Sequence, residues 1–425
     1  MTLLFGGFFL LLLLGVPIAF SMIGVGLVYL SFEPRISMMV APQQLVDSLD
    51  SFPLLAVPFF VLAGFLMNAA GVTGRLVAMA RSLIGHIRGG LAHAMIMAGM
   101  LMAGVSGSGT ADAAALGSVM IPAMKEDRYD AGFAVALSAA AGAIGPIIPP
   151  SIMLIIYGHL GNVSVGQLFL AGAIPGVLFG LFLMAVAYFT ARAKGYGSDT
   201  ARAPLRVMVR ALRLGLLDLT LPVLVIGGIV AGAFTPTEAG AVAVVYVLLI
   251  GLLVYRTLNR RTIVFALRES IMVLGTVMLT IAAAGILQFA LALMQAGALV
   301  TEFFAVLGGG ALLFLLLTNV LLILLGCVLE VTAVLVLLTP ILVPALAQFG
   351  IDPVQFGVIM TLNLAIGLLT PPVGLGMFVT CAIGNVSVER YVRAAWPMLL
   401  ALLGLLVLVN LVPGLTLWLP GLAFE

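Results

Sequence analysis

Nine apolar runs, each long enough to cross a lipid bilayer as a helix, divide this chain into segments joined by short loops. A hydrocarbon core about 30 Å thick needs roughly 20 helical residues. The runs lie near residues 3–30, 53–70, 131–157, 167–190, 214–232, 236–255, 270–294, 353–380 and 394–412. With 63% hydrophobic and 8% charged residues, the composition is also far from that of a soluble protein. We therefore predict an all-α membrane protein with many spans.

Other local signals narrow the class of protein. The first run lacks the basic segment and cleavage site of a signal peptide, so residues 2–30 are predicted to form one retained spanning helix. Cys327 and Cys381 stand in apolar segments without metal-type spacing, which indicates core packing. No GxxxxGK[ST] loop occurs, so ATP is excluded as the energy source within this chain and an ion gradient remains.

The second half of the sequence repeats the first. An offset of 222 residues relates a set of matching positions: Pro122 and Pro344, Pro149 with Pro150 and Pro371 with Pro372, Pro175 and Pro397, and Asp130 and Asp352. The pentapeptide Gly-Asn-Val-Ser-Val at 161–165 recurs at 384–388, one residue out of this register. Four proline matches and a pentapeptide indicate a duplicated chain.

The basic residues indicate that the two copies have opposite orientations, because Lys and Arg accumulate in cytoplasmic loops. The loop that holds Arg75 and Arg88 is basic, whereas its equivalent at 293–310 has no Lys or Arg. Residues 158–166 also lack a basic residue, whereas their equivalent in the second copy is basic. We therefore predict an inverted repeat, with a cytoplasmic N-terminus and a periplasmic C-terminus.

Two further apolar segments, 91–124 and 311–345, are interrupted centrally by polar or glycine-rich sequence and are predicted to be re-entrant hairpins. Repeat 1 (1–190) then contains scaffold helices in 1–90, hairpin 1 at 91–124, a broken helix at 131–157 and a helix at 167–190. Residues 191–235 form a cytoplasmic loop at 191–213 and a linker helix at 214–232. Repeat 2 (236–425) contains scaffold helices in 236–294, hairpin 2 at 311–345, a broken helix at 353–380 and a helix at 394–412.

Each hairpin tip is predicted to lie beside a broken helix. The tips are residues 106–112 and 326–332, and the breaks are the proline-containing segments 145–151 and 367–374. Proline leaves backbone carbonyls without a donor, and such carbonyls can bind a monovalent cation. Helix N-termini attract anions such as carboxylates. One central apparatus could therefore hold both a cation and an organic acid.

Ionisable and amide side chains at membrane depth are candidates for function because their burial is costly. For Asp112 and Glu330 the sequence leaves cation-linked function and support of the hairpin equally open. Glu238 is predicted to cap the helix that follows Thr235. Asn363 is a candidate cation ligand or, like Asn68, an interhelical hydrogen-bonding residue.

At these residues the chain resembles the large membrane subunit (M-type, DctM-like) of the tripartite ATP-independent periplasmic (TRAP) transporters. The resemblance covers essentially the whole chain. It is carried by GVSGS at 104–108 with MIPAM at 120–124, GPIIPPS at 145–151 with Tyr157 and Gly158, TPTEAG at 235–240, Leu325 and Gly326 with Leu329 and Glu330, and TPPVG at 370–374.

The resemblance implies a sodium-coupled, elevator-type importer of the bacterial inner membrane rather than an enzyme. Its substrate would be a small organic acid such as a C4-dicarboxylate or sialic acid, delivered by a periplasmic binding protein (P-type). A small four-helix membrane subunit (Q-type) would be the second partner, and sodium would be the coupling ion, with no other cofactor. The sodium-binding positions would be Ser106, Gly107, Ser108, Gly145, Pro149, Gly326, Thr332, Asn363, Gly367 and Thr370. The substrate-binding positions would be Ser108, Thr110, Asp112, Pro150, Glu330 and Pro371.

Two alternatives remain at this level. A stand-alone divalent-anion symporter shares paired hairpins and inverted repeats but needs no binding protein. An intramembrane enzyme is less well supported, because no HExxH or GxSxG motif occurs. The sequence does not identify the substrate.

Overall fold

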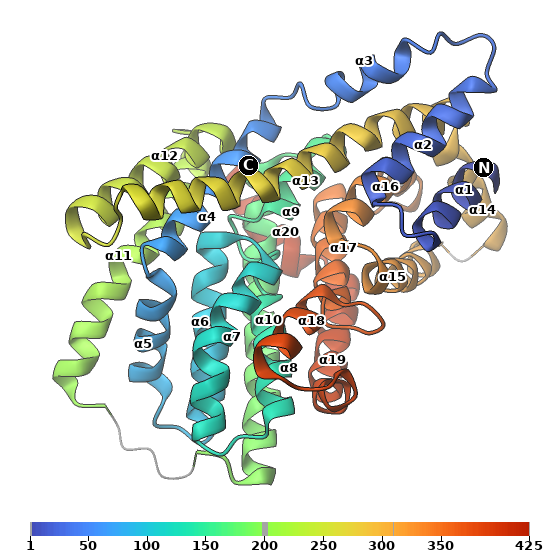
Figure 1. Ribbon diagram of the computed structural model, residues 1–425. Coiled ribbons are helices and arrows are strands. Elements are labelled where there is room, and N and C mark those ends of the chain that lie inside the picture. The colour runs from blue at the N-terminus through green and yellow to red at the C-terminus, as the bar shows by residue number, and fades with distance from the viewer. Residues whose placement is uncertain (1, 198–202, 309, 425) are drawn as a thin grey trace.

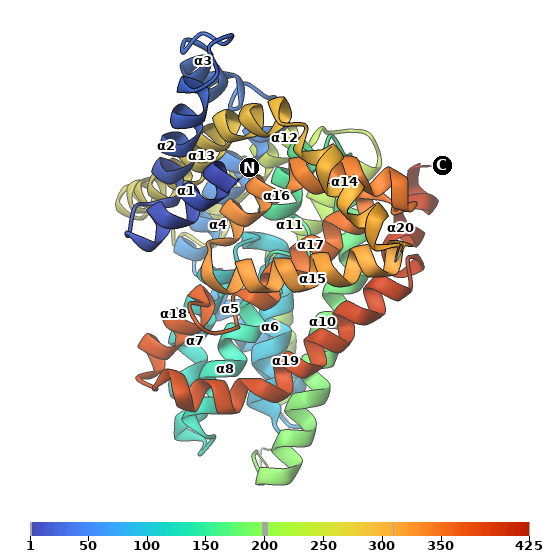
Figure 2. The ribbon, with the colours of Figure 1, turned by 90° about the vertical axis from the view of Figure 1, so that its right-hand side faces the viewer.

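The computed structural model describes residues 2–197, 203–308 and 310–424, and within these ranges all regular structure is helical. In Figure 1, α5 (Val72–Ile84), α6 (Gly90–Ser106) and α7 (Gly109–Glu126) run side by side, while α13 (Arg260–Leu293) crosses above them. The same crossing is visible in Figure 2, where α1 (Thr2–Leu13) and α2 (Ile18–Ser31) lie at the edge of the molecule. The predicted all-α fold class is confirmed.

Seven of the described helices are long and apolar enough to cross a membrane. They are α10 (Val165–Lys194), α11 (Leu205–Val230), α12 with its π-helical end (Pro236–Val254), α13, α15 (Gly310–Val328), α16 with the 3₁₀ turn that follows it (Val331–Phe349) and α19 (Val388–Leu411). An eighth results if α4 (Ala56–Ala69) and α5, which meet at 68°, count as one span. Five of the nine predicted spans are among them, since three others are divided into shorter helices and the span predicted at 53–70 contains only the 14-residue α4. The remaining two long helices, α15 and α16, are the arms of the predicted hairpin 2.

The two helices predicted to be broken are interrupted at equivalent positions. In the first copy α8 (Ala131–Gly142) is followed by α9 (Ile152–Leu160), and in the second copy α17 (Pro353–Gly367) is followed by α18 (Leu375–Gly384). Residues 143–151 form break 1 and residues 368–374 form break 2. Each break holds a proline pair, whose missing N–H groups prevent the helix from continuing.

The turns of the two hairpins also fall within the tips that the sequence predicts. The chain reverses at Gly107 and Ser108 between α6 and α7, and at Leu329 and Glu330 between α15 and α16. We call the turn at residues 106–112 tip 1 and the turn at residues 326–332 tip 2. That both hairpins are re-entrant in a bilayer remains a prediction.

The single spanning helix predicted over residues 2–30 is wrong. The chain instead forms α1 and α2, which fold back on each other. Gly15 has a left-handed backbone (φ +82°), and Pro17 cannot donate a hydrogen bond to the preceding turn. Together they end the first helix after 12 residues.

Segments treated as loops in the sequence are partly helical. The loop with Arg75 is α5, and its equivalent in the second copy is α14 (Ala296–Leu307). The loop predicted over 191–213 is shorter, because α10 continues to Lys194 and α11 begins at Leu205; residues 198–202 lie outside the described part. The remaining elements are α3 (Val40–Asp47), η1 (Pro53–Leu55), η2 (Ile250–Val254), η3 (Ala347–Phe349) and α20 (Gly414–Phe424).

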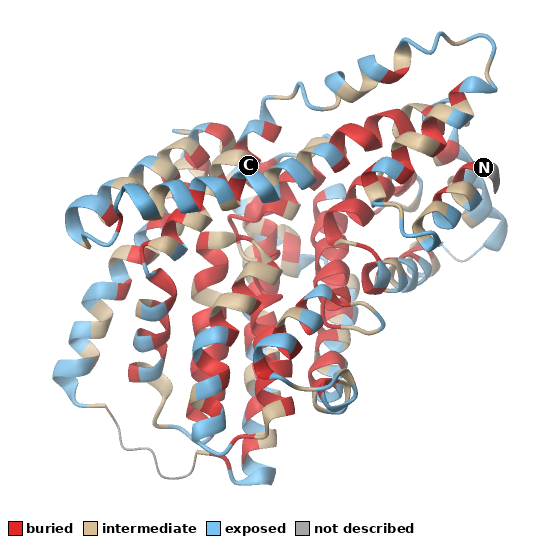
Figure 3. Ribbon diagram, in the orientation of Figure 1, coloured by how far each residue is buried: buried red, intermediate tan, exposed pale blue. Residues whose placement is uncertain are grey.

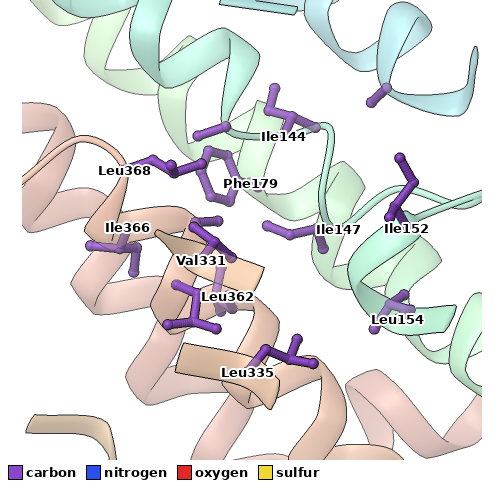
Figure 4. Packing of buried hydrophobic residues seen from close by; sticks show 14 of the residues in the cluster. Ile144, Ile147, Ile152, Leu154, Phe179, Val331, Leu335, Leu362, Ile366 and Leu368 are labelled. Carbon is purple, nitrogen blue, oxygen red and sulfur yellow. The ribbon is translucent and has the colours of Figure 1, made fainter. Parts of the chain in front are cut away.

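The two copies share one hydrophobic core. Buried residues concentrate on the central helices, including α6, α8 and α17, whereas α11, α12 and α13 expose much of their outer faces (Figure 3). Figure 4 shows Ile144 and Ile147 of break 1 close to Val331 and Leu362 of the second copy, with Phe179 of α10 nearby. This packing holds tips and breaks of both copies together at the centre.

Candidate functional site

Tip 1 rests directly on break 1. Gly107 has φ +61°, and a Cβ atom at this position would lie 2.7 Å from the carbonyl oxygen of Pro150 and 3.4 Å from Cα of Ser151. The turn therefore needs glycine both for its backbone conformation and for the close approach. The carbonyl of Pro149 lies 3.6 Å from the place a Cβ of Gly104 would take.

Asp112 is buried at tip 1 with only one of its carboxylate oxygens satisfied. Ser106 Oγ donates a hydrogen bond to Oδ1, while Oδ2 has no partner among the described residues and the residue is 2% exposed. A Cβ atom on Gly145 would lie 2.7 Å from Oδ2, so this oxygen faces break 1. Because an unpaired buried polar group costs about 1–3 kcal/mol, and more if charged, the arrangement fits a bound cation.

The N-terminus of α7 is open beside Asp112. Ser108 is the N-cap residue, with an extended backbone, and its side chain makes no capping hydrogen bond. Ser108, Thr110 and Ala111 instead line a cavity of about 320 Å³. An uncapped helix N-terminus carries partial positive charge and free N–H groups, which suits an anion.

The cavity lies between tip 1 and the bend that joins α4 to α5. Asn68 and Thr73 line it from the bend, where Thr73 Oγ1 donates to Asn68 Oδ1 over 3.0 Å. Phe65 and Met102 contribute apolar surface. Asp112 is the one charged side chain among the described residues that line this cavity.

Tip 2 is closed by its own carboxylate. Glu330 is the N-cap residue of α16: Thr332 Oγ1 donates to Oε1 over 2.8 Å, and the N–H of Ala333 donates to Oε2 over 3.1 Å. Both oxygens of Glu330 are therefore used within the protein. Of the two roles left open for Glu330 by the sequence, these contacts favour support of the hairpin.

Tip 2 and break 2 are joined by backbone hydrogen bonds. The carbonyl of Cys327 accepts from the N–H of Val373 (3.0 Å) and of Gly374 (3.2 Å). A Cβ atom on Gly367 would lie 2.7 Å from the carbonyl carbon of Gly326, so these two glycines pack backbone against backbone. Thr370 Oγ1 donates to the carbonyl of Ile366 over 2.8 Å.

Asn363 lies away from tip 2, in a chain of amides. Its Nδ2 donates to Asn319 Oδ1 (2.7 Å), and Asn319 Nδ2 donates to Asn410 Oδ1 (3.0 Å). These bonds connect α17, α15 and α19. The structure therefore gives Asn363 the interhelical role, while its buried Oδ1 has no partner among the described residues.

The predicted substrate-binding residues do not all line the same cavity. Ser108, Thr110 and Asp112 line the cavity at tip 1, whereas Pro150, Glu330 and Pro371 do not. The sequence does not single out Thr73 as a wall of this cavity, and it predicts Asn68 only as an interhelical hydrogen-bonding residue. Their position next to Ala70 and Gly71, where α4 bends into α5, was the available signal.

An ion pair that the sequence analysis did not predict fixes this bend. Arg75 Nε and Nη2 donate to Asp218 Oδ2 (2.9 Å) and Oδ1 (3.0 Å), and Nη1 donates to the carbonyl of Ala70 (2.8 Å). The guanidinium also stacks over the ring of Tyr255 at 3.6 Å. Arg75 is 15% and Asp218 1% exposed. An acid within an apolar run such as 214–232 needs a counter-ion, so this rule could have singled out Asp218, although not its partner.

Other predicted roles are structural in the folded protein. Glu238 and Thr235 form a capping box, as predicted: the backbone N–H and the hydroxyl of Thr235 donate to Oε2 of Glu238, and the N–H of Glu238 donates to Oγ1 of Thr235. Cys327 and Cys381 are free and buried, which confirms core packing.

Polar contacts also join the two copies at the ends of α7 and α8. Lys125 Nζ donates to the carbonyl of Gly384, and Arg390 Nη2 pairs with Asp130 Oδ2 at 2.6 Å. Partial burial alone would raise the pKa of Asp130. The hydrogen bonds from Arg390 and from the N–H of Phe133 outweigh it and hold that pKa below its usual value.

Paired hairpins seated on broken helices, with a cavity beside one tip, place the protein among multispan helical membrane transporters. Its fold is similar to that of the YdaH transporter of Alcanivorax borkumensis, with a TM-score of 0.60 and 18% identity over 87% of both chains. MtrF of Neisseria gonorrhoeae, from a class of antimetabolite efflux pumps, is similar with a TM-score of 0.54 and 14% identity over 87% of this chain and 83% of that one. At these identities the likeness concerns the fold alone.

Comparison of the amino-acid sequence with known proteins shows the family of this chain. Residues 5–415 match the family model for the DctM component of the tripartite ATP-independent periplasmic transporters, and the chain belongs to this family. It is 43% identical to the sialic acid TRAP transporter large permease protein SiaM of Vibrio cholerae, over 97% of this chain and 96% of SiaM. It is 40% identical to the C4-dicarboxylate large permease protein DctM of Pseudomonas aeruginosa, over 89% and 88%. The family comprises transporter subunits and not enzymes, and the predicted resemblance is confirmed.

Proposed function

We propose that this chain is the transport subunit of a sodium-coupled importer that moves a small organic acid into the cytoplasm. Relatives are named for sialic acid, C4-dicarboxylates and 2,3-diketo-L-gulonate, all of which carry a carboxylate. A periplasmic binding protein delivers the acid, and a small four-helix membrane subunit completes the complex. The complex lies in the bacterial inner membrane, with the N-terminus cytoplasmic and the C-terminus periplasmic.

The main support for this proposal is that the N-terminus of α7 has no side-chain cap and lies beside an unpaired carboxylate oxygen of Asp112. Ser108 and Thr110 bind the substrate carboxylate, which the partial positive charge of α7 attracts. Asp112 Oδ2 and the carbonyls freed at break 1 near Gly145 bind one sodium ion. The sodium ion in turn offsets repulsion between Asp112 and the substrate, which makes anion binding dependent on sodium.

A second sodium ion binds where tip 2 meets break 2. Gly326 and Gly367 bring two backbones into contact there, and Thr370 adds a hydroxyl oxygen. Glu330 lies beside this place and supplies negative charge while it caps α16. No further cofactor is proposed.

Movement follows from how the helices are grouped. Both hairpins and both broken helices are tied together by the shared core, by the bonds of Cys327 and by the contact of Lys125 with Gly384. The cavity lies between this group and the bend of α4 and α5. We propose that the group moves as one body against a scaffold that includes α4, α12 and α13, carrying the cavity across the membrane.

The charge of the transported anion limits how many sodium ions must accompany it for the membrane voltage to drive uptake. Moving one charge across the membrane is worth about 2.3 kcal/mol per 100 mV, so two sodium ions only cancel the cost of a dianion. A monoanion with two sodium ions enters with a net positive charge and is driven by the voltage. A dianion needs more than two sodium ions for the voltage to help.

Uptake into proteoliposomes tests the proposal. The chain, its small subunit and the binding protein encoded beside them are reconstituted, and uptake of the binding protein's ligand is followed with and without a sodium gradient. We expect uptake only with sodium and only with the binding protein. Uptake that persists without the binding protein would favour the stand-alone carrier, and uptake without sodium would reject sodium coupling.

A further inference from the structure

The first turns of the linker helix α11 stand apart from the body of the protein. Figure 1 shows this end of α11 projecting at the lower left, beside the end of α5. From Leu205 to Leu214 most residues are exposed, including the apolar side chains of Leu205 and Val209. Further along, Asp218 is buried against Arg75. The exposed end is therefore a surface that the described part of the chain does not cover.

A hollow of about 540 Å³ lies on this end of the helix, and the described residues that line it come from α11. Three of them are arginines, Arg206, Arg210 and Arg213, whose spacing of four and three residues places them on one helix face. The other three, Leu205, Val209 and Leu214, are apolar. The hollow thus combines three guanidinium groups with hydrocarbon walls.

The three arginines are not neutralised by the described residues. None of them has a described carboxylate within 4.0 Å, and Asp218, the one acidic residue on α11, is bound by Arg75. Arg390 and Arg393, by contrast, each pair with a carboxylate. Three neighbouring positive charges repel one another, so a shared anion would stabilise this face.

We propose that this hollow binds the phosphate headgroup of an anionic phospholipid. Arginine matches phosphate through paired hydrogen bonds, and its aliphatic stem can lie along acyl chains while the charge reaches the headgroup level. The site lies at the end of a helix apolar enough to span the bilayer, where headgroups are found. A lipid also explains the exposed walls of Leu205 and Val209, which a soluble phosphate would leave in water.

Such a lipid would fix the depth of α11 in the membrane. This helix connects α10 of the first copy to α12 of the second copy, and its middle holds the partner of Arg75 at the bend. The bound lipid would thus hold the connection between the copies at the headgroup level, independently of whether the transported ion is sodium.

The test compares two triple variants that remove equal charge. One is Arg206→Gln/Arg210→Gln/Arg213→Gln; the control is Arg256→Gln/Arg260→Gln/Arg261→Gln, exposed arginines between α12 and the first turn of α13 that are not among the described residues lining this hollow. Each purified protein is titrated with phosphatidylglycerol or phosphatidylcholine, and bound lipid is counted by native mass spectrometry. We expect phosphatidylglycerol binding about fivefold weaker for each arginine removed from the hollow. The control should bind like the unchanged chain.

Further measurements keep the proposal falsifiable. A triple Arg→Lys variant of the hollow keeps the charge and should retain most of the binding, while unchanged thermal unfolding of the Gln variant shows that it is folded. Equal binding of phosphatidylglycerol by the Gln variant and the control would overturn the proposal. Equal affinity for phosphatidylcholine, or full competition by inorganic phosphate, would also overturn it. So would loss of the small subunit from the hollow variant with lipid binding unchanged, because the surface would then belong to that subunit.

Discussion

The two hairpin tips occupy equivalent places in the repeat but differ in what closes the helix behind them. At tip 1 the N-cap residue of α7 is Ser108, which makes no capping bond and faces a cavity. At tip 2 the N-cap residue of α16 is Glu330, at the equivalent position, and its carboxylate closes the helix end. This one difference between equivalent positions leaves the N-terminus of α7 without a side-chain cap and gives α16 one.

The residues that neighbour the two tips also differ. Tip 1 faces the bend of α4 and α5, where Arg75 and Asp218 hold the backbone around Asn68 and Thr73. The position equivalent to Arg75 in the second copy is Gly297, which cannot form such a pair. The equivalent segments of the two halves thus form similar turns and breaks, while their side chains leave one helix end without a cap and cap the other.

Removing the guanidinium at the bend should have the largest effect. Arg75→Met leaves Asp218 buried without a counter-ion, and we expect the free energy of unfolding to fall by about 3–5 kcal/mol. Thermal unfolding in detergent would show this as a lower midpoint. Arg81→Met, an exposed position on the same helix, is the control. If the double variant Arg75→Met/Asp218→Leu did not recover stability, the ion pair would not be the cause.

Neutralising the unpaired carboxylate at tip 1 should have the second-largest effect. Asp112→Asn keeps the size of the side chain but removes the charge that we assign to sodium. We expect sodium-dependent uptake to fall about 10- to 150-fold, as for loss of a charge-assisted contact of about 1.5–3 kcal/mol. Glu126→Gln, an exposed acid at the end of the same helix, should leave uptake unchanged. Normal sodium dependence of Asp112→Asn would remove Asp112 from the site.

Exchanging the caps examines the difference between the tips directly. Glu330→Ala removes the cap of α16 and should lower the free energy of unfolding by about 1 kcal/mol. Ser108→Glu gives tip 1 the cap of tip 2; it should stop uptake by closing the anion site without destabilising the fold. Both variants are read by thermal unfolding and by proteoliposome uptake. Full uptake by Ser108→Glu would show that the open end of α7 does not bind substrate.

The smallest effect is expected at the ion pair that joins the copies outside both tips. The pKa of Asp130 is lowered in the folded protein, so its contribution to stability is present above the pKa of an ordinary aspartate, about 4, and is lost as pH falls through the lowered value. Arg390→Gln should lower the midpoint of thermal unfolding slightly at pH 7 and by less as pH falls through this range, which flattens the pH dependence. A large change at pH 7 would mean that this exposed pair does more than surface pairs do.

Much of the architecture follows from the sequence, because its strongest signals are local. Proline pairs predict where helices break, and polar residues in apolar runs predict where hairpins turn. Ser108, Thr110 and Asp112 could be predicted at one site because one turn of chain holds them together. Pro150, Glu330 and Pro371 could not be excluded from that site, because only packing decides which side of a turn faces a cavity.

The errors have the same origin. The pair of Arg75 and Asp218 joins residues that are 143 positions apart, and no local pattern indicates that distance. Hydropathy alone did not divide residues 2–30, since both short helices are as apolar as a single span. The cap at Glu330 could not be predicted from residue preference, because glutamate is not among the residues that commonly cap helix N-termini.

The chain of amides from Asn363 through Asn319 to Asn410 sets the axial register of the second hairpin. If α15 slid by one helical turn along α17, both side-chain bonds would break and their amides would be left in apolar surroundings. Ala141, which stands where the first copy would have Asn363, cannot form such a bond. The second hairpin is thus held against sliding by side-chain bonds at a position where the first hairpin has no matching bond.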